Sequence, residues 1–308
     1  MKLVKNTLAL AICSIVAVPT FAADINIYGR ADVSLQKSDE GDGSFTEVKS
    51  NASRIGFKGT HQINDDLEVV YKAEFQVDLD GDSAKGDSIT DRNQYVGLKG
   101  AFGEVLLGKN DTMLKQSQGK VDLFSDLNGD IKNLWKGENR MADTISYKSP
   151  KFNDFRVGIT YIAEDAVDAE DAVSVAVFYG DKKLKKSTIY ASVAMDSEVK
   201  GYDTTRATIQ GKVSGVTLGA IYHTQEKVDG SAEMDGFLVS AKYKIDKVTV
   251  KGQYQTADYD GGDSKSGMTV GADYSLAKST KLYAFYTSFD MDTGADEDYL
   301  AVGMQYKF

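Results

Sequence analysis

The sequence predicts an all-β fold, a sixteen-stranded antiparallel transmembrane β-barrel. Three observations lead to this fold class. Apolar residues recur at every second position for about ten residues at a time, which is the period of a strand with one apolar face. Short and long connections alternate between these segments. Beyond residue 22, no stretch approaches the ~18 to 20 apolar residues of a membrane-spanning helix.

Composition narrows the class further. The 308 residues are 42% apolar and 27% charged, with two prolines and one cysteine. Such a chain can bury a core, but its single cysteine excludes a disulfide scaffold. The formal net charge of −10 would repel nucleic-acid phosphates, so nucleic acid is excluded as a partner.

The first 22 residues have the features of a secretory signal peptide. Lys2 and Lys5 precede an apolar run over 8–18, and Thr20 and Ala22 supply small residues at positions −3 and −1 of a cleavage site. We therefore expect a signal peptide at 1–22 and a single barrel domain at 23–308. Cleavage removes two of the 36 basic side chains and leaves 34 against 46 acidic ones, a net charge of −12, with no cysteine.

Sixteen strand segments follow in order. They begin near residues 24, 53, 67, 92, 104, 139, 155, 172, 184, 204, 216, 235, 247, 267, 280 and 297. Short turns are expected near 64–66, 101–103, 150–154, 181–183, 213–215, 245–246 and 277–279, and long loops near 37–52, 78–91, 111–138, 164–171, 196–203, 226–234, 257–266 and 290–296. This regular alternation favours a membrane barrel over a secreted β-sandwich, whose greasy faces would be buried.

Most segments separate an apolar from a polar face. In the segment near 247, Val248, Val250 and Tyr254 share one face, opposite lysine, threonine and glutamine. The segment near 280 is ambiguous, because aromatic or aliphatic residues occupy both of its faces.

The last strand carries a specific local signal. One face consists of Leu300, Val302, Met304, Tyr306 and the terminal Phe308. An aromatic end of this kind predicts an assembly signal at Tyr306 and Phe308, read by the outer-membrane assembly machinery. The lipid-facing ladder must also close the barrel against the first strand.

Several motifs occur together in order. They are YGRADVSLQ from Tyr28, SRIGFKG from Ser53, DRNQYVGLKGAFGEVLLGK from Asp91, ISYKSPKF from Ile145 to Phe152, and the final QYKF. On these motifs, the chain resembles the general porins of Gram-negative outer membranes over nearly its whole length. The resemblance implies a homotrimer of sixteen-stranded barrels, in each of which the third long loop folds into the lumen and narrows it.

The third loop, 111–138, is the longest connection and independently supports an inward fold. It carries seven apolar residues between 121 and 135 that would prefer cover to solvent. The resemblance places carboxylates of the pore constriction on this loop, which makes Asp122, Asp126 and Asp130 candidates. The Pro-Glu-Phe-Gly-Gly-Asp motif of the best-known porins is absent here, so which acid faces the lumen stays open. A solvated acidic loop is the alternative.

Opposite the loop, the resemblance implies a basic wall made of Arg30, Arg54, Arg92 and Arg140. The last three lie nine or ten residues before their following short turns, at similar heights on descending strands. Scattered lumen arginines paired with local carboxylates are the alternative. Arg156 also belongs to a polar strand face, as does Arg206, but neither has the matched spacing.

These features predict an outer-membrane porin that passes small hydrophilic solutes and ions by diffusion, without a cofactor. Outer-membrane lipid and lipopolysaccharide are expected partners. The alternatives are a solute-selective channel with a binding site, a barrel enzyme and a surface adhesin.

Catalytic and metal-binding motifs are absent from the sequence. The two histidines, His61 and His223, belong to no catalytic motif, and GxSxG is absent. The aspartates at 78, 80 and 82 suggest a calcium loop, but Ile89 stands at its twelfth position, which excludes an EF-hand. Loose divalent binding between acidic loops and lipopolysaccharide remains an alternative.

Overall fold

A computed structural model describes residues 25–81, 86–164, 170–292 and 294–308. The expected signal peptide at 1–22 lies outside these residues. In the described ranges, the chain forms one antiparallel sheet whose strand order follows the sequence, and pairing of the first strand with the last closes it into a barrel.

The strands are long and joined mostly by tight connections. They are β1 (Asn26–Asp39), β2 (Ser44–Ser50), β3 (Arg54–Asn64), β4 (Leu67–Val77), β5 (Ile89–Gly100), β6 (Gly103–Asp111), β7 (Arg140–Lys148), β8 (Phe155–Ile162), β9 (Ala172–Gly180), β10 (Ile189–Val199), β11 (Tyr202–Val213), β12 (Val216–Lys227), β13 (Glu233–Ile245), β14 (Val248–Tyr259), β15 (Ser264–Ser275), β16 (Thr280–Asp290) and β17 (Glu297–Lys307). The two short helical turns are α2 (Met113–Ser117) and the 3-10 turn η3 (Ile131–Asn133).

The barrel has sixteen strands because β2 and β3 are two parts of one strand. Both pair with β1, through Val33 opposite Ser50 and Arg30 opposite Arg54. The interruption at 51–53 is a bulge: Ala52 has a positive φ of 50°, and the Ser53 hydroxyl accepts the Asp32 backbone N–H. The predicted sixteen-stranded antiparallel barrel is confirmed.

Side chains alternate between the two faces of the wall as the sequence predicts. Val250 and Tyr254 on β14, like Leu300 and Val302 on β17, are exposed on the outer face. An apolar belt of this kind is stable only against hydrocarbon or another apolar surface, while the closed sheet satisfies its backbone hydrogen bonds. In the described residues, the helices are too short and too polar to span a bilayer.

The connections differ from the expected alternation in several places. The expected long loop at 37–52 is wrong, because β1 and β2 form a hairpin that leaves only 40–43 between them. The expected long loop at 196–203 is also wrong, because only 200–201 separate β10 from β11, and those expected at 226–234 and 257–266 shorten to 228–232 and 260–263. The expected short turn at 181–183 extends to 188, since β10 begins only at Ile189. There the Asp181 carboxylate accepts backbone N–H groups from Lys183 and Lys185, which holds a compact turn in place of a strand.

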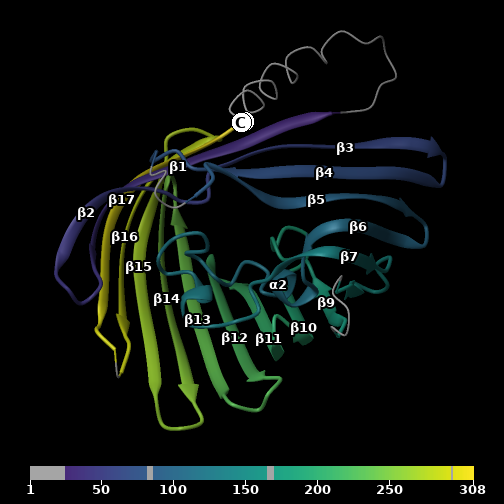
Figure 1. Cartoon of the computed structure of the whole chain (residues 1–308). Helices are drawn as coiled ribbons and strands as arrows, with labels where there is room; N and C mark the ends of the chain where they lie inside the picture. The colour runs from purple at the N-terminus through teal and green to yellow at the C-terminus, as the bar shows by residue number, and fades with distance from the viewer. Residues whose placement is uncertain (1–24, 82–85, 165–169, 293) are drawn as a thin grey trace, which may run out of the picture.

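The long connection between β6 and β7 lies inside the ring of strands, with α2 against the wall of β8 to β11 (Figure 1). Its apolar residues pack on inward side chains of the barrel. Val121, Phe124, Ile131 and Trp135 are buried in one cluster with residues of β12 to β17. The inward fold expected of the third loop is therefore present.

The segment near 280, whose faces the sequence left ambiguous, forms β16, and both of its faces are apolar for a physical reason. Leu282 and Tyr286 point outward and are exposed, whereas Tyr283 and Phe285 point inward and are buried. Phe285 lies 6.3 Å from Phe124 of the loop, measured between ring centroids. Both faces are apolar because one meets lipid and the other meets the loop.

The C-terminal end closes the barrel. Gly29 and Phe308 exchange backbone hydrogen bonds of 3.0 and 3.2 Å. A side chain at Gly29 would collide with the Phe308 ring, since a Cβ there would lie 2.2 Å from its Cζ. The rings of Tyr306 and Phe308 are stacked on the outer face, 5.9 Å apart.

Candidate functional site: a charged gap between the wall and the third loop

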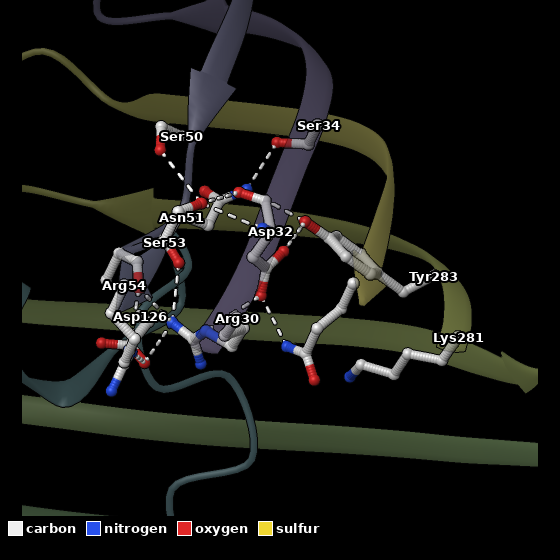
Figure 2. Close-up of polar contacts among 12 residues, drawn as sticks. Arg30, Asp32, Ser34, Ser50, Asn51, Ser53, Arg54, Asp126, Lys281 and Tyr283 are labelled. Carbon is white, nitrogen blue, oxygen red and sulfur yellow. Dashed lines mark hydrogen bonds and ion pairs between the residues drawn. The ribbon is translucent and has the colours of Figure 1, made fainter. Parts of the chain in front are cut away.

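Two arginines of the wall converge on one carboxylate of the loop (Figure 2). Arg30 on β1 and Arg54 on β3 are paired in register, so both side chains enter the lumen side by side. Each guanidinium donates to Oδ2 of Asp126 at 2.8 Å. Arg30 is also held by the carbonyls of Asn51 and Ala52, which the bulge turns toward it. The bulge therefore positions the basic wall.

Asp126 is presented by a strained loop conformation. Its φ is 71°, and its backbone N–H donates to the Asp130 carboxylate at 2.9 Å. Burial alone would raise the pKa of Asp126, but the charges of Arg54 and Arg30 outweigh burial and hold it well below its usual value. The carboxylate therefore stays ionised between the two arginines.

The other two arginines of the predicted wall pair within the barrel. Arg92 donates from Nε to Glu74 at 2.9 Å and from Nη1 to Gln76 at 3.2 Å. Arg140 lies 3.0 Å from Asp111. These arginines are brought to the same cavity as Arg30 and Arg54, but among the four wall arginines of the described structure only Arg30 and Arg54 form ion pairs with the loop beyond Asp111.

The other two candidate acids mainly hold the loop together. Asp122 accepts the backbone N–H groups of Phe124 and Ile131, and it is absent from the cavity lining. Burial and the neighbouring charge of Asp130 raise the pKa of Asp122. Asp130 lines the cavity, and it caps η3 by accepting the Lys132 N–H at 3.0 Å. Asp126 is thus the candidate acid that contacts the arginines.

The gap between wall and loop is a cavity of about 660 Å³ with an unequal charge balance. Its basic lining residues are Arg30, Lys49, Arg54, Arg92, Lys115, Lys120, Lys132, Arg140 and Lys182, and its acidic ones are Asp111, Asp126, Asp130 and Glu138. Nine positive charges against four negative ones give a local excess of five. The sign is opposite to that of the whole chain.

A buried ion pair that the sequence analysis missed anchors the loop. Arg206 on β11 is fully buried and donates from Nη1 to Glu138 at 2.6 Å. Burial raises the pKa of Glu138, and the charges of Arg206 and Lys115 offset only part of that effect. Arg206 lies on the opposite wall, on β11, so its distance from the next turn does not match that of the other arginines.

An aromatic contact fixes the same end of the loop. Trp135 stacks on His223 with ring centroids 4.8 Å apart, and its indole N–H donates to the Thr256 carbonyl at 2.6 Å. His223 therefore supports the loop, while His61 is exposed on β3. The sequence did carry one signal for this covered wall. Both faces of the segment near 280 are apolar, as expected of a strand that is covered on its inner side as well.

Further polar contacts hold the middle of the loop. The Gln253 side chain accepts the Leu123 N–H at 2.8 Å and donates to the Gly129 carbonyl at 2.9 Å. Within the described residues, no group of three or more His, Cys, Asp or Glu side chains is placed to hold a metal ion. The geometry therefore places fixed charges along a gap whose two sides, the barrel wall and the third loop, are both held in place.

Comparisons with known proteins place these features in a family. The family model described as Gram-negative porin matches residues 7–307. Outer membrane protein U of Vibrio parahaemolyticus is 26% identical over 99% of this chain and 100% of its own length. Outer membrane porin protein 32 of Delftia acidovorans is 27% identical over 94% of this chain and 91% of its own length.

Solved structures agree in fold. The anion-selective porin from Comamonas acidovorans superposes with a TM-score of 0.77 at 20% identity, covering 93% of this chain and 100% of that one. Salmonella typhi OmpF gives a TM-score of 0.77 at 19% identity, covering 93% and 98%. With the family match spanning almost the whole sequence, the chain belongs to the Gram-negative porins and forms a passive diffusion channel in the outer membrane.

Proposed function

We propose that small hydrophilic solutes cross this channel through the gap between the four arginines and the third loop, and that the gap favours anions. The observation that carries the proposal is the lining of nine basic and four acidic side chains. Arg30 and Arg54 share a single loop carboxylate, and the second carboxylate near Arg30, that of Asp32 at 3.8 Å from Nε, is not part of the lining.

The mechanism is electrostatic and consumes nothing. Arginine stays protonated at any relevant pH, and Asp126 stays ionised beside it, so the field across the gap is permanent. A polar solute exchanges water contacts for contacts with these charges, whereas an apolar solute must disrupt oriented water and gains little. Selection for hydrophilic solutes follows from this difference.

The net negative charge of the whole chain does not determine the ion preference. Fixed charges act over about a Debye length, ~10 Å at 0.1 M salt, so the residues lining the narrow gap dominate. The Comamonas acidovorans porin is described as anion-selective, which supports the same preference here.

We propose that the channel is a homotrimer without catalytic activity. OmpT of Vibrio cholerae in its trimer form has the same fold, with a TM-score of 0.71 at 17% identity. Outer-membrane phospholipid and lipopolysaccharide would cover the remaining apolar belt. The contacts of Tyr306 and Phe308 at the barrel seam support their proposed role as an assembly signal.

Reversal potentials in a planar bilayer under a KCl gradient test the proposal. The wild type should favour chloride, and Arg54→Gln combined with Arg92→Gln should shift the preference toward potassium. Lys37→Gln is the matched control, because Lys37 is exposed on the outer face of β1. Equal reversal potentials for wild type and the double variant at low salt would show that the arginine wall does not line the permeation path.

A further inference from the structure

A second, smaller cavity of about 190 Å³ lies at the short-turn ends of β7 to β10. Lys148 is the last residue of β7 and Arg156 the second residue of β8, and both occupy inward positions of their strands. Lys151 and Lys182 reach the cavity from the two neighbouring turns. Four cations thus line a space large enough for a small solute.

These cations differ from the other arginines of the described lumen. Arg30, Arg54, Arg92, Arg140 and Arg206 all form ion pairs with carboxylates. Within the described residues, none of the four cavity cations forms one. Lys148 donates to the neutral amide oxygen of Gln116, Lys151 donates to the Gly180 carbonyl, and the Nε of Arg156 is buried without any acceptor.

The two acids of the lining compensate only part of this positive charge. Both oxygens of Asp181 are engaged by backbone N–H groups of its own turn. Asp154 supplies only one further negative charge, so the lining keeps an excess of two positive charges. Lys148 and Arg156 are half-buried, whereas Lys151 and Lys182 are exposed. The two half-buried cations lack a counter-charge of their own, and an oxyanion would supply one by accepting charge-assisted hydrogen bonds from the set.

The cavity is placed on the route of solutes. Gln116 of α2 and Lys182 line both this cavity and the charged gap. Tyr190 and Phe178 complete the wall, and the Tyr190 hydroxyl donates to the Ser117 carbonyl at 2.9 Å. An anion that passes the arginines would therefore meet a second set of donors on the short-turn side.

We propose that Lys148, Lys151, Arg156 and Lys182 form a binding site for a small multivalent oxyanion, of which inorganic phosphate is the simplest. The site rests on the proposed anion-favouring channel and makes it saturable for such solutes. An oxyanion with several acceptor oxygens can bridge two or three of these donors at once, whereas chloride offers a single centre. Binding should therefore discriminate phosphate from chloride.

The test is the block of chloride current by added inorganic phosphate in single channels. Wild type should show a saturable block, and Lys148→Gln combined with Arg156→Gln should raise the half-blocking concentration about ten-fold, the loss expected for strong charge-assisted contacts. Lys242→Gln is the matched control, an inward lysine at the short-turn end of β13 outside this cavity. Permeation of a neutral sugar should be the same in all three.

Each other outcome overturns the site. No saturable block in an anion-selective wild type, an unchanged block in the double variant, or an equal loss in Lys242→Gln would each remove it. A channel without anion preference would instead remove the proposed function. Should the double variant fail to insert, Lys151→Gln, which changes only a turn residue, should raise the half-blocking concentration in the same direction.

Discussion

The two halves of the barrel interior differ in chemistry. From β12 to β17, the inward side carries a buried apolar cluster that includes Ile221, Leu238 and Phe285, beside buried polar residues such as Gln253. From β1 to β7, the inward side of the wall carries Arg30 and Arg92 with their partners. The third loop covers the half formed by β12 to β17, whereas the half formed by β1 to β7 faces the loop across the cavity.

This difference teaches how a pore is narrowed without being closed. One wall binds the loop by removing apolar surface from water, which is non-directional and scales with buried area. The other wall meets the tip of the loop through Asp126. The loop is thus fixed from behind, and its charged face is left to solutes.

The largest expected effect comes from breaking the buried anchor. Arg206→Leu leaves Glu138 buried without its guanidinium, at a cost of about 3 to 5 kcal/mol. The loop should detach from its wall, which faster hydrogen exchange of the Val121 and Ile131 amides and noisier conductance would report. The barrel should still insert, because its strand pairing is unchanged.

A double variant that removes both charges, and a pH series on the single variant, sharpen that experiment. Arg206→Leu with Glu138→Leu should restore slow exchange in large part, since no unpaired charge remains. Burial already raises the pKa of Glu138, and loss of Arg206 raises it further, so its ionised form is the costly one. The defect of the single variant should therefore grow from pH 5 to pH 8. A defect that shrinks with rising pH contradicts the anchor.

The next largest effect concerns the aromatic contact. Trp135→Phe keeps a ring against His223 but loses the hydrogen bond to the Thr256 carbonyl, at a cost of about 0.5 to 1.5 kcal/mol. Exchange of the loop amides should accelerate by about two- to ten-fold. Phe155→Leu on the outer face is the control and should leave exchange unchanged. Equal exchange rates in the two variants would assign no anchoring role to Trp135.

Alternation along the strands was sufficient to predict the barrel, because one face must meet hydrocarbon and the other water. It failed for β16, where the inward face meets the loop, and Phe285 is apolar for that reason. Loop placement is a long-range packing problem, so the sequence could indicate that 111–138 needs cover but not which strands provide it.

The candidate site was predictable in part for the same reason. Matched spacing brought Arg54, Arg92 and Arg140 to one cavity. The choice among three loop acids depended on local turns that place Asp126 at a φ of 71°, and no periodic pattern encodes such turns. The roles of these residues in conduction stay predictions.

A smaller effect should follow from changing the loop tip. Asp126→Asn removes the carboxylate between Arg30 and Arg54, so chloride preference should increase. A unit charge about 4 Å away in water contributes on the order of 1 kcal/mol, so the anion-to-cation permeability ratio should rise by no more than about five-fold. Asp122→Asn should change it less, since Asp122 is not part of the lining. A larger shift from Asp122 would reverse the assignment.

The smallest expected effect is that of acid pH on Asp126. Its pKa is held below the usual value by Arg54 and Arg30 against the opposing effect of burial. A carboxyl with a lowered folded pKa keeps its charge, and the stabilisation from its pairs, until the pH falls through that folded value. At pH 3.5 an ordinary aspartate is about 70% protonated, yet the difference in reversal potential between wild type and Asp126→Asn should persist from pH 7 to pH 3.5. Comparing the two proteins isolates Asp126, because other acids titrate equally in both.

In an Arg54→Gln background the same difference should fade at pH 3.5, since the pKa of Asp126 moves back toward its usual range. A difference that fades equally with and without Arg54 would mean that the wall does not control the charge of the loop tip.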